Sequence, residues 1–238
     1  MLAANDVYAT AAEKLAPERV PVVSFPYPLL PRYFELHDRG RYRDAFRLKP
    51  SDILITVPSR IIERKGIKEA VIAISKLPDN FFLCLPCAIN PLDHEYWHGI
   101  ETSKEFKKAQ KRILIPKKAM LPEEMPYLYA ASDIILMPSY YEGAPVATVE
   151  AMAAKKPFIG ANSQGINGFI RHMENGLLVP KKSTDEIVGA VMTLVSDESL
   201  QHILIAQALE DVRNISWEFQ LPKLLEVYQQ CVQKDSLV

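Results

Sequence analysis

The chain has 238 residues, of which 48% are hydrophobic and 24% are charged, and its 28 basic and 29 acidic residues leave a formal net charge of -1. This is the composition of a folded globular protein, so it excludes a chain that is mainly disordered, collagen-like or coiled-coil. The balanced charge provides no long-range positive field, so we expect no nucleic acid and no anionic membrane surface among the partners.

The sequence favours a reducing compartment and no membrane span. No apolar run reaches the roughly 18 residues that a membrane-spanning helix needs. The first residues include Asp6 and Glu13, where a signal peptide would have positive charge followed by an apolar segment. Three cysteines are too few for a disulfide framework. We therefore expect a cytoplasmic protein.

Residues 1–50 are predicted to be an N-terminal arm or linker. The pattern indicates a helix over 6–16, a strand over 20–25, a proline-punctuated turn over 26–28 and a helical segment with aromatic and arginine residues over 33–47. Because acidic residues interrupt the last segment, packing against a sheet is favoured over contact with a membrane or partner.

Residues 51–238 alternate short aliphatic runs with segments of helical period, which is typical of a parallel sheet with crossover helices. A helix is expected to start near Ser183, which precedes Glu186 at the spacing of a capping box. Strands are expected over 52–57, 81–85, 113–115, 134–137, 157–161 and 177–179. Helices are expected near 67–77, 101–110, 122–131, 145–155, 184–196 and 217–231. The fold class is therefore α/β.

The most informative segment covers residues 133–153. A buried strand ends at Pro138, a loop carries Glu142 and Gly143, and a helix is predicted to begin at Pro145, since proline suits a first turn. Ligands of open parallel sheets bind at the carboxyl ends of the strands, where this loop lies. The first turn of the helix would offer unpaired backbone N–H groups to a phosphate.

A second carboxylate, Glu150, lies one to two turns inside the same predicted helix. A buried carboxylate needs hydrogen-bond donors, and the vicinal hydroxyls of a sugar would supply two. A phosphate site beside a ribose site indicates a nucleotide.

A pair of cations follows the first strand of the sheet. Arg60 and Lys65 flank one turn at that strand's carboxyl end, where a fork-shaped donor and a point charge can both meet a diphosphate. Such cations would stabilise the negative charge that develops on a departing nucleoside diphosphate. Taken alone, the segment is equally compatible with a solvated loop.

Together these motifs resemble the donor-binding, C-terminal half of retaining glycosyltransferases of the GT-B fold, family 4, from about Val20 to the C-terminus. The resemblance implies a Rossmann-like parallel sheet with helices on both faces, as a single GT-B lobe over 51–238. The matching motifs are Arg60 with Lys65-Gly66, Ala131-Ser132-Asp133 running into Met137-Pro138-Ser139, Glu142 to Glu150 with Ala151-Met152-Ala153, Gly165, Asn175 to Val179, and Trp217 to Tyr228.

The resemblance also implies the role of each site residue. Arg60 and Lys65 would bind the diphosphate and steady the leaving group, Glu142 would contact the sugar near the reacting carbon, and Glu150 would hold the ribose hydroxyls. The remaining expected substrate-binding positions are Ser59, which replaces the family's usual glycine, and the backbone of Gly143, Ala144 and Val146.

The implied reaction is transfer of a hexose from a UDP- or GDP-sugar with retention of configuration, without a metal or other cofactor. Consistent with this, the sequence has no Asp-x-Asp pair. Base, sugar and acceptor are not predicted by the sequence. Two further departures from the family are Pro86-Cys87-Ala88 in place of a glycine-rich turn, and no glutamate near Gly168.

The family's N-terminal lobe, which binds the acceptor, has no counterpart in this sequence beyond residues 1–50, which resemble its last elements and the linker. An excised domain, half of a split enzyme with a separate acceptor-lobe protein, and a stand-alone module all fit. We expect weak or no turnover by the chain alone, because one lobe closes a cleft poorly against water. The alternative function is a non-catalytic nucleotide-sugar binding or partner-regulating module.

Two other patterns have a structural explanation as well as a functional one. Cys84 and Cys87 with His94 and His98 are ligand types for zinc, but their spacing favours buried thiols and a surface loop, and a redox pair is disfavoured. The loop over 165–168 fits either a phosphate- or sugar-side loop or a simple turn.

Overall fold

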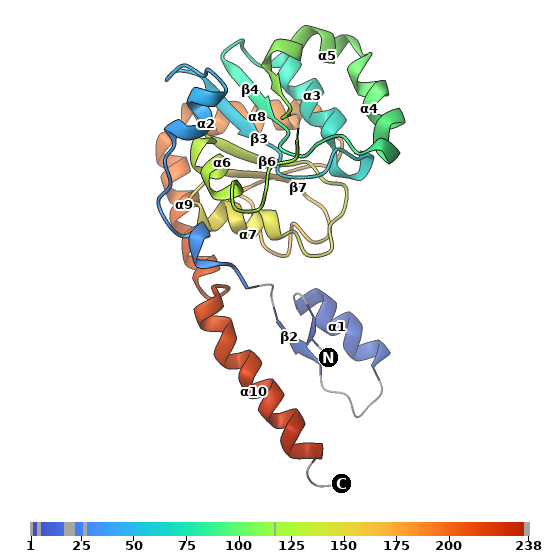
Figure 1. Cartoon of the computed structure of the whole chain (residues 1–238), viewed down its shortest axis with the longest axis vertical. Helices are drawn as coiled ribbons and strands as arrows, with labels where there is room; N and C mark the ends of the chain where they lie inside the picture. The colour runs from blue at the N-terminus through green and yellow to red at the C-terminus, as the bar shows by residue number, and fades with distance from the viewer. Residues whose placement is uncertain (1, 4–5, 17–21, 26–27, 117, 236–238) are drawn as a thin grey trace.

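The computed structural model describes residues 2–3, 6–16, 22–25, 28–116 and 118–235. Its main feature is a six-stranded parallel sheet in the order β5-β4-β3-β6-β7-β8 (Figure 1). The strands are β3 (Ile53–Thr56), β4 (Phe81–Cys84), β5 (Ile113–Leu114), β6 (Ile134–Met137), β7 (Phe158–Ala161) and β8 (Leu177–Val179). The predicted α/β class and Rossmann-like parallel sheet are confirmed.

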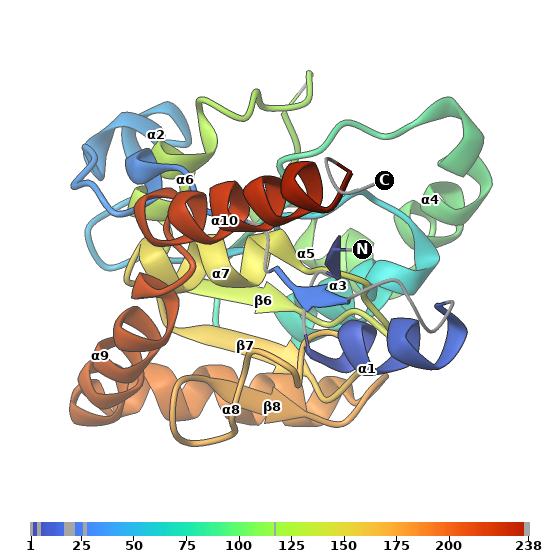
Figure 2. The ribbon, with the colours of Figure 1, turned by 90° about the horizontal axis from the view of Figure 1, so that it is seen from below.

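Helices cover both faces of the sheet because its strands are apolar on both sides. Ile134 and Leu136 of β6 pack in one core cluster, while Ile135 and Met137 pack in a second one. Figure 2 shows α7 on one side of β6 and β7 and α8 on the other. The helices of this domain are α3 (Ile67–Lys76), α4 (His94–Glu101), α5 (Lys104–Ala109), α6 (Met125–Ala131), α7 (Val146–Ala153), α8 (Thr184–Ser196) and α9 (Glu198–Arg213), with 3-10 turns η2 (Glu63–Lys65), η3 (Pro91–Asp93) and η4 (Gln110–Arg112).

Three details of the helices differ from expectation. The helix expected over 101–110 is α5, which starts only after Ser103, whose hydroxyl accepts a hydrogen bond from the Phe106 amide at 3.1 Å; the preceding helix α4 was not predicted. Helix α9 was not predicted. Ser183 does precede α8, but its side chain makes no capping hydrogen bond, so the expected capping box is absent there.

The N-terminal arm contains α1 (Asp6–Leu15) and a small parallel sheet of β1 (Leu2–Ala3) and β2 (Val23–Ser24). Residues 20–21 of the expected strand and 26–27 of the expected turn lie outside the described residues. The segment over 33–47 forms part of η1 (Pro31–Tyr33) and then α2 (Gly40–Ala45). Tyr42 and Phe46 pack against the core cluster around Leu54, so this segment lies on the sheet domain, as expected.

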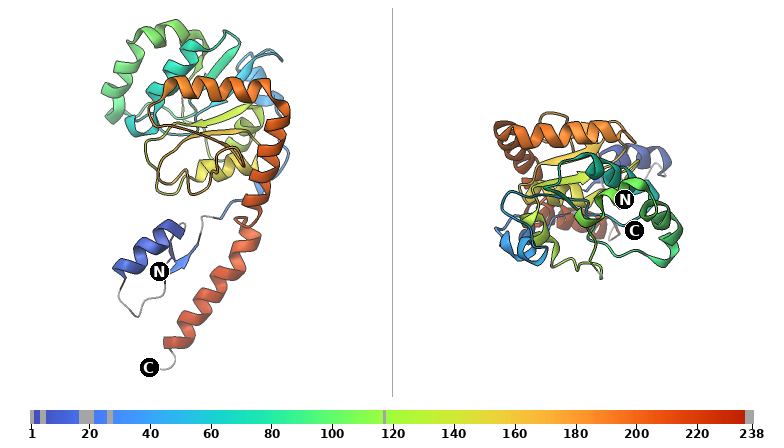
Figure 3. Two further views of the ribbon diagram at one scale, coloured as in Figure 1. Left: turned by 180° about the vertical axis from the view of Figure 1, so that it is seen from behind. Right: turned by 90° about the horizontal axis from the view of Figure 1, so that it is seen from above.

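Two segments leave the sheet domain together. Helix α10 (Trp217–Asp235) and the α1–β2 arm both extend away from it on the same side (Figures 1 and 3). Pro222 lies inside α10. In the part of the chain described, no helix combines the length and the apolar character needed to cross a bilayer.

Candidate functional site

The sheet has its topological switch point between β3 and β6. From β3 the chain moves outward through β4 to β5, and from β6 it moves the opposite way through β7 to β8. In open α/β sheets the loops that follow the two central strands diverge at this point, and ligands bind at the carboxyl ends of those strands. Lys65 follows β3 and Glu142 follows β6, so both predicted residues belong to this edge.

The turn that carries Lys65 packs directly on the end of β6. Gly66 has φ 68°, and a Cβ there would lie 2.2 Å from the carbonyl oxygen of Pro138. Only glycine accommodates both the left-handed backbone and this close approach. The Tyr140 amide also donates to the Arg64 carbonyl at 2.8 Å, so the turn after β3 and the loop after β6 are joined through their backbones.

A second backbone contact fixes the loop from the side of β7. The Glu142 amide donates to the Gln164 carbonyl at 2.9 Å. Gly165 has φ 92°, and a Cβ there would lie 2.3 Å from the Glu142 carbonyl oxygen. Gly165 therefore allows a tight turn that packs against Glu142 and positions it. This contact gives a physical basis to the interpretation of the 165–168 loop as a simple turn.

The side chain of Glu142 is 6% exposed and forms two ion pairs. Lys65 Nζ lies 2.5 Å from Glu142 Oε1, and Arg64 Nη1 lies 3.3 Å from Oε2. The buried carboxylate is thus compensated by cations from the neighbouring turn. The structure brings together the predicted Lys65 and Glu142. Sequence reasoning missed Arg64, although its place beside Lys65 was a signal.

The other predicted cation, Arg60, is exposed at the same edge. Burial raises the pKa of the Cys87 thiol, while the charges of Arg60 and Lys65 act in the opposite direction. Both cations therefore lie near Cys87, which follows β4.

Glu150 points toward a group of tyrosines and not into solvent. Tyr129 Oη, on α6, donates to Glu150 Oε2 at 2.8 Å. Burial raises the pKa of the Glu150 carboxyl, while hydrogen bonds from Tyr33 and Tyr129 and the charge of Arg32 lower it. Burial is the largest of the influences that raise the pKa of Tyr129, and the charge of Glu150 is the next. Sequence reasoning missed both tyrosines.

The start of α7 offers fewer free amides than expected. The helix begins at Val146 and not at Pro145. The Val146 amide donates to the Ala144 carbonyl at 2.8 Å, and the Thr148 amide donates to the Pro145 carbonyl at 2.9 Å. These two N–H groups are already engaged by the preceding turn, so any phosphate contact there depends on the remaining backbone.

The other predicted binding residues lie around this loop and turn. Gly143 and Ala144 are exposed and Val146 is half-buried. Ser59 is buried, and its hydroxyl donates a long, 3.4 Å hydrogen bond to the Arg60 carbonyl. Their roles toward a ligand stay predictions.

Among the residues that the structure describes, no group of three or more His, Cys, Asp or Glu side chains is placed to hold a metal ion. Cys84 is buried and Cys87 is partly buried. Burial raises the pKa of Cys84 to about 12.

Comparisons with known proteins place this arrangement in a family. Residues 38–211 match the family described as glycosyl transferases group 1. The D-inositol 3-phosphate glycosyltransferase of Rhodococcus erythropolis is 31% identical over 89% of this chain and 48% of its own length. A second such protein, from Rhodococcus opacus, is 30% identical over 76% of this chain and 38% of its own length. The chain thus spans about half or less of the length of these relatives.

Solved structures share the fold. Sucrose-phosphate synthase from Thermosynechococcus elongatus superposes with a TM-score of 0.82 at 20% identity, over 98% of this chain and 58% of that one. HepE of Anabaena, solved in complex with UDP-glucose, gives 0.80 at 16% identity, over 100% and 63%. The C-terminal domain of a group 1 glycosyl transferase from Francisella tularensis gives 0.65 at 25% identity, over 78% and 93%. With its parallel sheet and its Lys65–Glu142 edge, the chain belongs to the glycosyl transferases group 1 family and forms the C-terminal half of a GT-B fold.

Proposed function

We propose that this chain binds a nucleotide diphosphate sugar at the carboxyl edge of β3 and β6 and takes part in transferring its hexose with retention of configuration. The observation that carries the proposal is the ion pair between Lys65 Nζ and Glu142 Oε1, 2.5 Å long, across the switch point of the sheet. An ion pair of two side chains at a ligand-binding edge can exchange one partner for a ligand.

The exchange depends on how many hydrogen bonds each group can form. The Lys65 ammonium has three N–H donors, and its bond to Glu142 uses one of them. A diphosphate would take the others, with Arg60 as a second cation from the same turn. As the bond to the sugar breaks, these cations stabilise the charge on the leaving diphosphate. The proposal needs no metal, because side chains supply the positive charge.

The same exchange leaves Glu142 beside the sugar. A carboxylate whose lysine has turned toward a phosphate keeps acceptor capacity for a sugar hydroxyl, and Arg64 still compensates its charge. Retention then follows if the acceptor attacks from the face that the diphosphate leaves, as proposed for this family. The backbone of Gly143 and Ala144 would line this part of the ligand.

The ribose would lie at Glu150. Tyr33 and Tyr129 each donate one hydrogen bond to this carboxylate, and a carboxylate offers about four acceptor positions, so room remains for two hydroxyls. The complex of HepE with UDP-glucose supports a nucleotide sugar as the ligand class, since that protein shares the fold. UDP- and GDP-sugars are both proposed donors.

The acceptor would be bound by a lobe outside this chain, on the same polypeptide or on a separate protein, because the matched relatives are about twice as long. The cytoplasm is the proposed compartment, on the grounds of three cysteines in 238 residues.

Calorimetric titration with UDP, GDP and ADP, and then with the matching sugar donors, tests the proposal. We expect Lys65→Ala and Glu150→Ala to weaken binding at least about tenfold, because each removes a charged hydrogen-bond partner of the ligand. Glu142→Gln should keep nucleotide binding and lose hydrolysis or transfer. Lys68→Ala, an exposed lysine in the first turn of α3, is the matched control and should bind like the native chain.

Failure to bind any of the three nucleotides would contradict the proposal. Binding without turnover, even beside candidate acceptor-lobe proteins, would replace the catalytic function by a nucleotide-sugar binding module. Weakening by Lys68→Ala equal to that by Lys65→Ala would mean that binding is diffuse and not located at the switch point.

A further inference from the structure

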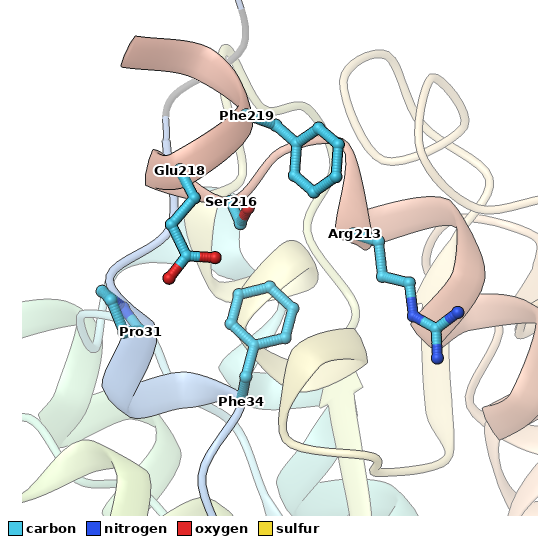
Figure 4. A pocket seen from close by; sticks show the side chains of 6 residues that line it. All are labelled: Pro31, Phe34, Arg213, Ser216, Glu218 and Phe219. Atoms are coloured by element: carbon cyan, nitrogen blue, oxygen red, sulfur yellow. The ribbon is translucent and has the colours of Figure 1, made fainter. Parts of the chain in front are cut away.

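A pocket of about 260 Å³ lies where the N-terminal arm and α10 leave the sheet domain, and none of its lining residues belongs to the Lys65–Glu142 edge (Figure 4). Its walls come from η1, from the end of α9 and from the first turn of α10. The residues that line it are Pro31, Phe34, Arg213, Ser216, Glu218 and Phe219. Figure 4 shows the two phenyl rings on opposite sides, with the Ser216 hydroxyl between them.

Backbone hydrogen bonds hold these walls together. The Leu29 amide donates to the Ile215 carbonyl at 3.0 Å, and the Trp217 amide donates to the Leu29 carbonyl at 3.1 Å. The arm before η1 and the connection between α9 and α10 are thus paired beside the pocket. The pocket therefore belongs to a fixed joint and not to two loosely apposed segments.

The Ser216 hydroxyl is a buried group without a partner. The residue is 9% exposed, and Oγ has no hydrogen-bond partner among the described residues. A serine just before a helix usually accepts a bond from a first-turn amide. Here the Phe219 amide donates to the Ser216 carbonyl instead, at 3.1 Å. Because an unpaired buried hydroxyl is costly, a hydrogen-bonding ligand group at this point would lower the free energy.

The charges at the rim favour a neutral ligand. Arg213 is paired with Glu210 at 2.7 Å, and Glu218 is exposed on the other side. Opposite signs at the two ends give the pocket no net attraction for an ion. The rings of Phe34 and Phe219 instead offer apolar faces that suit another aromatic ring.

The volume of the pocket limits the size of the ligand. A cavity of about 150 Å³ holds benzene, and drug-sized ligands need roughly 300 to 1,000 Å³. A pocket of about 260 Å³ fits one substituted ring. We propose that it binds a neutral, single-ring aromatic group that carries a hydroxyl, with the ring between Phe34 and Phe219 and the hydroxyl on Ser216 Oγ. The residues of this site differ from those of the proposed donor site, but Tyr33 of the same turn, η1, donates a hydrogen bond to Glu150.

Phenol and toluene, which have nearly the same shape, test the proposal on the full chain. Backbone amide NMR shifts of residues 213–219 and of Leu29 give the dissociation constants. We expect phenol to bind more tightly than toluene, and Ser216→Ala to weaken phenol about fivefold without changing toluene. Phe219→Ala should weaken both. Tyr228→Ala, another exposed aromatic change on α10, is the control and should change neither.

N-acetyltyrosinamide distinguishes the two sources of such a ring. Tighter binding than phenol assigns the site to a tyrosine side chain of a partner, and weaker binding assigns it to a free small molecule. The proposal is overturned if phenol gives no saturable shifts at these amides, if phenol and toluene bind equally, or if Ser216→Ala weakens both to the same extent.

Discussion

The two ends of β6 carry a carboxylate each, and the two are held in different ways. At the amino end, Asp133 accepts from the Leu54 amide at 2.8 Å, from Arg43 Nη1 at 3.0 Å and from Arg39 Nη2 at 2.5 Å. Beyond the carboxyl end, the carboxylate of Glu142 is paired with Lys65 and Arg64. Both are anions next to two cations, so charge type alone does not separate them.

The two sites differ in whether the cation beside the carboxylate also donates hydrogen bonds to backbone carbonyls. Arg43 is 7% exposed and also donates to the carbonyls of Lys49 at 2.9 Å and Asp52 at 2.7 Å. Asp133 and Arg43 therefore fasten α2 and β3 to β6. The cation of Lys65, by contrast, is hydrogen-bonded to one side-chain oxygen of Glu142. We infer that the first cluster stabilises the fold and that the second is available to a ligand.

Replacing Arg43 gives the largest effect that this comparison predicts. Arg43→Met should lower the free energy of unfolding by about 3 to 5 kcal/mol, because it removes one donor from Asp133 and one from each of the carbonyls of Lys49 and Asp52. Arg39→Met is the control. Its side chain is 46% exposed, so the loss should stay within about 1 kcal/mol. Urea denaturation measures both, and equal losses would contradict the division of roles.

The carboxyl edge depends instead on glycine. Gly66→Ala should lower the free energy of unfolding by about 3 kcal/mol and weaken nucleotide binding, because a Cβ would meet the Pro138 carbonyl and φ is positive. Gly189→Ala, in α8, meets nothing within 4 Å. That control should raise stability by about 0.5 to 1 kcal/mol, since alanine favours a helix. A stable Gly66→Ala protein with native binding would show that the turn is not fixed against β6.

The sequence predicted the sheet well because the sheet is apolar on both faces. Each strand over 51–238 lies in a short, mainly apolar run, such as Ile134–Met137, all four residues of which are buried. Helix α9 escaped prediction for the opposite reason. Its buried residues are Leu204, Ala208 and Val212, a narrow stripe on a helix that is otherwise mostly polar.

The part of the site that follows from the topology of the sheet was predictable from the sequence. Lys65 and Glu142 follow neighbouring parallel strands, and the rule for strand ends brings them to one edge. The tyrosines at Glu150 were not predictable, because Tyr33 and Tyr129 come from segments that are far apart in sequence. Nor was the Asp133 cluster, in which each cation depends on tertiary hydrogen bonds.

The amino-end cluster should also make the stability of the fold depend on pH. Lys156 Nζ donates to the carbonyls of Ala130 at 2.9 Å and Ser132 at 3.0 Å. Burial, and then the charges of Arg39 and Arg43, lower the pKa of Lys156 to about 8. Its value in the unfolded chain is about 10.4.

Between these two pKa values the unfolded chain binds more protons than the folded one, so stability rises with pH. We expect a gain of about 1 to 2 kcal/mol in the free energy of unfolding from pH 7 to 9.5, which Lys156→Met removes. Lys155→Met, at an exposed neighbour, should keep the gain. Urea titrations across this range measure it, and a rise that survives in Lys156→Met would assign it to another group.

The smallest predicted effect is on nucleotide binding. It distinguishes Glu150, which we expect to contact the ligand, from carboxylates that only stabilise the fold. Tyr129→Phe removes the 2.8 Å hydrogen bond to Glu150 and should weaken nucleotide binding about threefold, since the other donors to this carboxylate remain. Fewer donors to the carboxylate raise the pKa of Glu150 further above its ordinary value. Binding that needs the ionised carboxylate should then fail at a higher pH than in the native chain.

The control for Tyr129→Phe has the same chemistry at a structural position. Tyr42 Oη donates to Glu124 Oε1 at 3.0 Å, near α2. Tyr42→Phe should change neither the affinity for nucleotide nor the pH at which it falls. Titrations from pH 4.5 to 8 compare the two variants. If both shift alike, then the loss of a tyrosine hydroxyl acts through stability, and Glu150 would no longer be distinguished from the structural carboxylates by its contact with ligand.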